Sequence, residues 1–135
     1  MLAHVEVFAD SRVVVVPAGI GTRPPRDTVD GRIDAARCFG AIATLDPTGV
    51  VLVRRGARAT LSDLFRAWGE PLTPSRIASF RARPPGRVTV FVDGRRSKLA
   101  PGLVPLFEHA EIVVEIGPHV PPHRSFTFAP TPKAR

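Results

Sequence analysis

The sequence predicts an α+β domain: a β-grasp-like mixed sheet packed on one main helix, with an extra β-hairpin at the N-terminus. A hairpin pattern that runs directly into a short amphipathic helix over residues 41–69 indicates this fold, as do strand-like segments before and after it. The 135 residues, 44% of them hydrophobic and 23% charged, suit one globular domain. We expect this domain over residues 1–117 and an extended, proline-rich tail over residues 118–135. The alternative architecture is a small β-barrel or sandwich with an incidental helix.

The central hairpin is predicted by two apolar segments, residues 41–45 and 50–53, on either side of a turn over residues 46–49. The turn reads Asp-Pro-Thr-Gly, which fits a type I turn. Pro47 presets its own φ, and the Asp46 carboxylate can accept hydrogen bonds from the turn.

The helix is predicted over residues 61–68. Thr60 and Asp63 have capping-box spacing, with Asp in place of the usual Glu. One apolar stripe follows at helical spacing: Leu61, Leu64, Phe65 and Trp68. Gly69 and Pro71 stand where the helix should end. We expect Trp68 to be the main anchor of the helix on the sheet.

Other strands are expected over residues 5–8 and 13–16, which form the N-terminal hairpin, and over residues 88–92 and 111–116. Two segments lack such patterns. Residues 20–39 are expected to form a long surface loop with a turn at Asp30-Gly31. Residues 72–86 are expected to be a connector with a short helical turn near Ile77 and Phe80. The tail, which contains Phe126 and Phe128, is expected to run extended over the body of the domain.

Nineteen basic residues against twelve acidic ones give a formal net charge of +7, which would attract a polyanion. The arginines are spread over all the loops without forming a stripe, and Phe80, Phe91 and Phe107 resemble core residues rather than stacking platforms. We therefore expect no specific nucleic-acid partner.

The single cysteine, Cys38, excludes an intrachain disulfide and is expected to be buried and inert. No segment is long enough to span a bilayer. The first residues read as a strand without the features of a secretory signal, so we expect a cytoplasmic location.

Four histidines are candidate metal ligands: His4, His109, His119 and His123. The last two are four residues apart but flank Val-Pro-Pro, which excludes a helix that would align them. We expect no cofactor and no metal, and retain a copper or zinc site using His4, Asp46 and the tail histidines as an alternative.

Acid–base catalysis is a second alternative, with His4, Asp46 or Glu111 as the titrating group. Glu111 and Glu115 fall on the same face of the last predicted strand, which we expect to be its solvated face. No serine stands in a nucleophile motif. An enzymatic function is therefore less favoured than binding.

A resemblance adds a further expectation. The segments that carry it are residues 8–12 (FADSR), 14–18 (VVVPA), 46–50 (DPTGV), 61–69 (LSDLFRAWG), 90–94 (VFVDG) and 109–113 (HAEIV). Together they resemble an uncharacterised actinobacterial domain that is often tethered outside the membrane. The central hairpin of that family typically carries His-x-His-Asp, which implies a metal site. The matching positions here are Ala43, Thr44, Leu45 and Asp46, so both histidines are replaced.

These expectations combine into one functional prediction: a non-catalytic binding or accessory protein that uses an apolar sheet-face surface. The predicted binding residues are His4, Ala43, Leu45 and Asp46. The expected partner is a small apolar molecule or another protein, a homodimer included.

Overall fold

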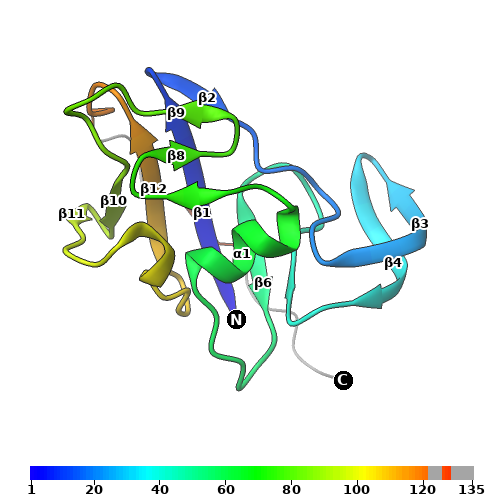
Figure 1. Cartoon of the computed structure of the whole chain (residues 1–135). Helices are drawn as coiled ribbons and strands as arrows, with labels where there is room; N and C mark the ends of the chain where they lie inside the picture. Colours follow the sequence, from blue (N-terminus) through cyan, green and yellow to red (C-terminus); the bar gives the residue numbers. More distant parts are fainter. Residues whose placement is uncertain (122–125, 129–135) are drawn as a thin grey trace.

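The structure is a computed structural model that describes residues 1–121 and 126–128 (Figure 1). Its elements are, in chain order, β1 (Leu2–Ala9), β2 (Arg12–Val14), β3 (Thr22–Val29), β4 (Arg32–Phe39), β5 (Ile42–Ala43), β6 (Val50–Val53), α1 (Leu61–Trp68), β7 (Leu72–Thr73), β8 (Arg76–Ile77), β9 (Phe80–Arg81), β10 (Thr89–Val92), β11 (Arg95–Arg96), the 3₁₀ turn η1 (Pro101–Leu103) and β12 (Glu111–Ile116).

The main sheet has seven strands in the order β11-β10-β12-β1-β6-β5, and β2 also pairs with β1. The two central strands, β1 and β12, are parallel, and the remaining pairs are antiparallel. This mixed sheet with one main helix confirms the predicted α+β class, and β2 confirms the N-terminal hairpin. The more specific β-grasp assignment stays a prediction.

The strands of the main sheet alternate between two faces, as the pleat requires. One face packs against α1 and β8 and forms the core (Figure 1). From the central strands that face contributes Ala3, Val5, Val7, Ile112, Val114 and Ile116, all buried together with Leu61, Leu64 and Phe65 of the helix. The opposite face carries the alternate residues of the same strands, and we call it the outer face.

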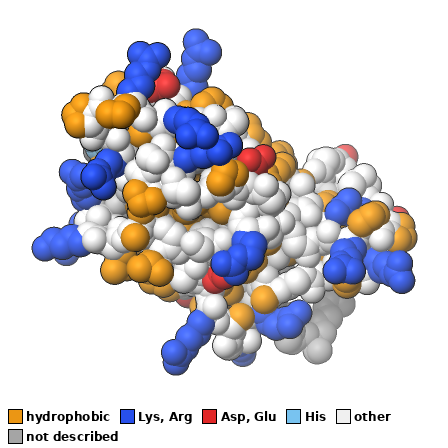
Figure 2. All heavy atoms as spheres, viewed as in Figure 1, with side chains coloured by type: hydrophobic (Ala, Val, Ile, Leu, Met, Phe, Trp, Pro, Cys, Tyr) orange, Lys and Arg blue, Asp and Glu red, His pale blue; other side chains and the backbone are white. Residues whose placement is uncertain are grey.

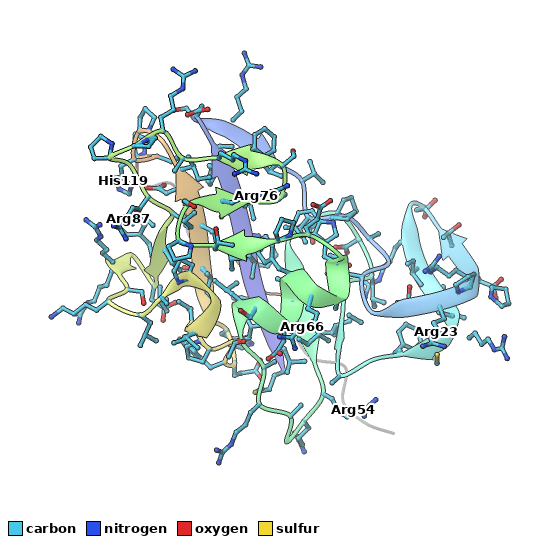
Figure 3. The ribbon with its side chains drawn as sticks, viewed as in Figure 1. Arg23, Arg54, Arg66, Arg76, Arg87 and His119 are labelled. Carbon is cyan, nitrogen blue, oxygen red and sulfur yellow. The ribbon has the colours of Figure 1, made fainter. Side chains whose placement is uncertain are left out.

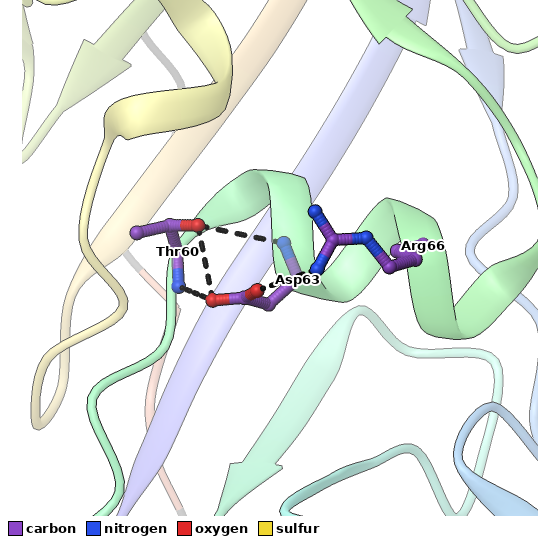
Figure 4. A network of polar contacts seen from close by, with 3 residues as sticks. All are labelled: Thr60, Asp63 and Arg66. Carbon is purple, nitrogen blue, oxygen red and sulfur yellow. Dashed lines mark hydrogen bonds and ion pairs between the residues drawn. The ribbon is translucent and has the colours of Figure 1, made fainter.

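The helix has the predicted bounds because its ends are fixed by side chains and by glycine (Figure 4). The Thr60 amide donates to the Asp63 carboxylate at 2.9 Å, and the Asp63 amide donates back to the Thr60 hydroxyl. Gly69 ends the helix in the left-handed region at φ 85°. The role expected for Trp68 is wrong, because Trp68 is only partly buried and Leu61, Leu64 and Phe65 are the anchors.

The long loop predicted over residues 20–39 is instead a second hairpin, β3–β4, which projects beside α1 in Figure 1. Its tip is the expected turn, with Asp30 and Gly31 at φ 51° and 76°. These strands have no recognisable sequence pattern because most of both strands is exposed, so apolar and polar residues need not alternate. The burial expected for Cys38 is wrong for the same reason: this cysteine is exposed.

The connector predicted over residues 72–86 is a small three-stranded sheet, β7-β8-β9, and the helical turn expected near Ile77 is wrong. Each of these strands has only two residues, which is too short for a periodic signal. Phe80 and Phe107 are 42% and 41% exposed, so their expected place in the core is also wrong.

Residues 118–121 and 126–128 of the predicted tail belong to the described structure, and the rest of the tail lies outside it. None of the helices in the described part of the chain has the length and apolar character needed to cross a membrane.

Candidate functional site

The outer face is a mixed polar and apolar surface, and the residues that form the candidate site come from three of its strands, β1, β10 and β12. Each of the two central strands contributes three residues to this site: His4, Glu6 and Phe8 from β1, and Glu111, Val113 and Glu115 from β12. The register places His4 beside Glu111 and Phe8 beside Glu115. Phe91 of β10 pairs with Val113, which extends the apolar part of this face toward the sheet edge.

His4 is held in a fixed orientation against the central hairpin. Its side chain is buried, Nε2 donates to the Thr48 carbonyl at 2.9 Å, and Nδ1 lies 3.5 Å from the Glu6 carboxylate. The Asp46 carboxylate accepts hydrogen bonds from the amide and the hydroxyl of the same Thr48. The turn of the central hairpin therefore connects His4 to Asp46.

Glu115 is a buried carboxylate, 3% exposed, near the end of β12 at one end of the outer face. Its Oε1 accepts a short hydrogen bond of 2.6 Å from His119, and its Oε2 accepts the Val120 amide at 3.2 Å. The solvated environment expected for this residue is wrong, because residues 118–121 turn back over the strand and supply the partners that a buried carboxylate needs. The His119 ring, labelled in Figure 3, also packs against Phe91, with ring centroids 4.4 Å apart.

Residues 126–128 occupy the other end of the outer face. The Phe126 ring stacks on His4 with centroids 3.9 Å apart and planes 12° from parallel. Phe128 stacks on His109 at 4.6 Å, and the two phenylalanine rings meet edge to face. The Phe126 amide donates to the Glu111 carboxylate. The segment is thus held through its side chains, by stacking on two histidine rings, and through its backbone, by a hydrogen bond to one carboxylate.

The structure brings together two of the four predicted site residues. His4 and Asp46 are joined through Thr48, as described above. Ala43 is 4% exposed, so its methyl group is not available at the surface, and Leu45 is partly buried with its carbonyl accepting the Ile33 amide at 2.7 Å. The binding role of these four residues stays a prediction.

Four residues of this site were not predicted as binding residues: Glu111, Glu115, Phe126 and Phe128. Two phenylalanines separated by one residue in a proline-rich tail were the signal for Phe126 and Phe128. For Glu115 the signal was its place on a strand rich in Val and Ile, where burial is common.

Within the described residues, no group of three or more histidine, cysteine, aspartate or glutamate side chains could hold a metal ion. His123, one of the tail histidines in the alternative metal site, lies outside those residues.

Comparison with protein-family models finds no match to this chain, and comparisons with curated proteins and with solved structures find none either.

Proposed function

We propose that this protein is a non-catalytic binding or accessory protein whose outer face holds an extended, phenylalanine-containing peptide segment of a partner protein. One observation carries the proposal: the outer face already seats residues 118–121 and 126–128 of its own chain, with Phe126 stacked on His4.

The contacts divide into two kinds that together suit peptide recognition. The Glu111 and Glu115 carboxylates accept the backbone amides of Phe126 and Val120, contacts that any peptide offers. The stacking of Phe126 on His4 depends on the side chain and would give sequence preference. A partner segment with phenylalanines at alternate positions would satisfy the same groups.

Such a partner would have to displace the protein's own segment. A tethered segment has an effective concentration in the millimolar range, so a free peptide competes poorly with it. A substitution that weakens the binding of the tethered segment, but leaves the outer face unchanged, should therefore allow a free peptide to bind there.

The test uses the full chain with Phe126→Ala and Phe128→Ala together, and a fluorescent peptide with the sequence of residues 118–129. We expect the double variant to bind this peptide at least tenfold more tightly than the unaltered chain does, measured by fluorescence anisotropy. The matched control is the same peptide with both phenylalanines replaced by alanine, which should bind neither protein. Absence of binding to the double variant, or equal binding of the two peptides, would overturn the proposal.

A second copy of this chain is one source of such a segment. If the segment is exchanged between copies, the unaltered chain will form a dimer at high concentration that the double variant does not form, as size-exclusion chromatography with light scattering would show.

We also propose that the chain is a relative of the actinobacterial domain, and that Ala43 and Leu45 of this chain replace the hairpin histidines of that family. We further propose that the protein acts in the cytoplasm. Fractionation of the producing cells tests the location.

A further inference from the structure

A second feature, separate from the outer face, is an open groove of about 710 Å³ between the loop of residues 17–22, the open end of the β3–β4 hairpin and the last turn of α1. Arg23 and Arg26 of β3, Cys38 and Phe39 of β4, and Trp68 of α1 line it. Figure 1 shows the hairpin and the helix on either side of this region.

The groove is cationic. Among the described residues that line it, two are arginines and none is acidic. Arg23, labelled in Figure 3, is exposed at the start of β3. Arg26 is held in place, since its Nε donates to the Thr22 hydroxyl at 2.7 Å and its Nη2 donates to the Thr22 carbonyl at 2.9 Å. A guanidinium already fixed in one geometry loses little conformational entropy when it binds an anion.

The loop of residues 17–22 also lines the groove, but three of its backbone amides are already hydrogen-bonded within the protein. The amides of Gly19 and Ile20 donate to the carbonyl and the hydroxyl of Thr44, and the Thr22 amide donates to the Gly19 carbonyl. Because these amides are used within the protein, the arginines are the groups that would meet an anion.

The remaining walls supply aromatic surface. Trp68 is partly buried, with its ring centroid 5.3 Å from that of Phe65, and it also lines the groove. Phe39 is 42% exposed on the hairpin side. Exposed aromatic surface beside fixed positive charge suits a ligand with a flat apolar body and one anionic group.

We propose that this groove binds a small aromatic molecule that carries a carboxylate or phosphate group, with Arg23 and Arg26 on the anion and Trp68 and Phe39 on the ring. The site does not depend on the outer face or on the peptide-binding proposal.

Two residues can serve as probes of ligand binding in the groove, because the only tryptophan and the only cysteine of the chain both line it. We would titrate the full chain with benzoate and with phenyl phosphate while following Trp68 fluorescence, and measure the rate at which iodoacetamide alkylates Cys38. Ionic strength is held constant, because a chain of net charge +7 attracts anions non-specifically. We expect saturable fluorescence change and slower alkylation with at least one of these anions.

Neutral and non-aromatic compounds separate the two parts of the site. Benzyl alcohol, which lacks the anion, and inorganic phosphate, which lacks the ring, should each bind at least tenfold more weakly than the better aromatic anion. Equal binding of inorganic phosphate and phenyl phosphate would overturn the proposal, as would equal binding of benzyl alcohol and the aromatic anions.

Two variants locate the anion site. Arg23→Gln and Arg26→Gln should each weaken binding at least tenfold, and Arg23→Gln leaves the hydrogen bonds between Arg26 and Thr22 in place. The matched control is Arg32→Gln, the same change of charge on the same hairpin but outside the groove. An equal loss in Arg23→Gln and Arg32→Gln would mean general electrostatic attraction and would overturn the proposal.

Discussion

At the scale of single residues, Gly49 makes the connection between the central hairpin and His4 possible. It has φ 86°, and a Cβ atom there would lie 2.4 Å from the Val5 carbonyl and 3.2 Å from His4 Nε2. Both atoms are fixed, the first by the central strand and the second by its hydrogen bond to Thr48. Any side chain at this position must therefore push apart β1 and the hairpin turn.

We predict that Gly49→Ala lowers the free energy of unfolding by about 3 kcal/mol or more, combining the left-handed backbone cost with overpacking. Gly56→Ala is the matched control, since Gly56 has φ 82° with open space around it. It should cost only about 1 kcal/mol. Urea unfolding of both variants measures the difference, and equal costs would show that the close approach at Gly49 is not important.

At the scale of elements, the capping box is the main local determinant of where α1 begins. Thr60→Ala removes the hydroxyl that accepts the Asp63 amide and should cost about 1 kcal/mol of stability. Arg66 lies 3.5 Å from the same Asp63, but its side chain is 79% exposed. Arg66→Ala should therefore change stability by less than about 0.5 kcal/mol. Urea unfolding would contradict this ranking if Arg66→Ala proved the more costly change.

The elements that the sequence predicts well are those whose signals are local. Thr60, Asp63 and Gly69 fix α1 at both ends, and the run of Val and Ile over residues 111–116 fixes β12. The hairpin β3–β4 and the two-residue strands β7–β9 could not be predicted, because exposed or very short strands have no apolar period. Their positions depend on tertiary contacts, such as the hydrogen bond from the Ile33 amide of β4 to the Leu45 carbonyl at 2.7 Å.

The candidate site was predictable only in part for a similar reason. Strand alternation predicts that His4 lies on one face of the sheet. The turn sequence predicts that the Asp46 carboxylate accepts hydrogen bonds from the backbone of the turn. The burial of Glu115 depends on His119 and Val120, which return over the strand after the turn that ends it. The groove depends on Arg26 and Trp68, which are forty-two positions apart and meet only through the fold.

At the scale of the whole molecule, the charge is spread rather than concentrated. Figure 2 shows lysine and arginine side chains scattered over this face of the protein, separated by hydrophobic and neutral surface. This agrees with the distribution expected from the sequence. Because arginines are common over the surface, the arginine pair of the groove differs from the others by its aromatic neighbours and not by its charge alone.

The molecule also divides into parts of different expected stability. The parallel pair β1–β12 lies at the centre of the main sheet, flanked on both sides by other strands, and its core face is covered by α1 together with the small sheet β7-β8-β9 (Figure 1). The hairpin β3–β4 has a single buried hydrophobic anchor, Ile33, at 5% exposure. Since local opening costs less where few apolar contacts break, the hairpin should open far more often than the central pair.

Native-state hydrogen exchange measures this difference directly. We predict that the amides of β3 and β4 exchange at least tenfold faster than those of β1 and β12 that are bonded within the sheet. Ile33→Ala should accelerate exchange in the hairpin and leave the central pair unchanged, because its side chain anchors only the hairpin. Equal protection of the two regions would mean that the hairpin opens together with the sheet. The groove would then be a rigid cleft, whereas independent opening would let its arginine-bearing wall move relative to Trp68.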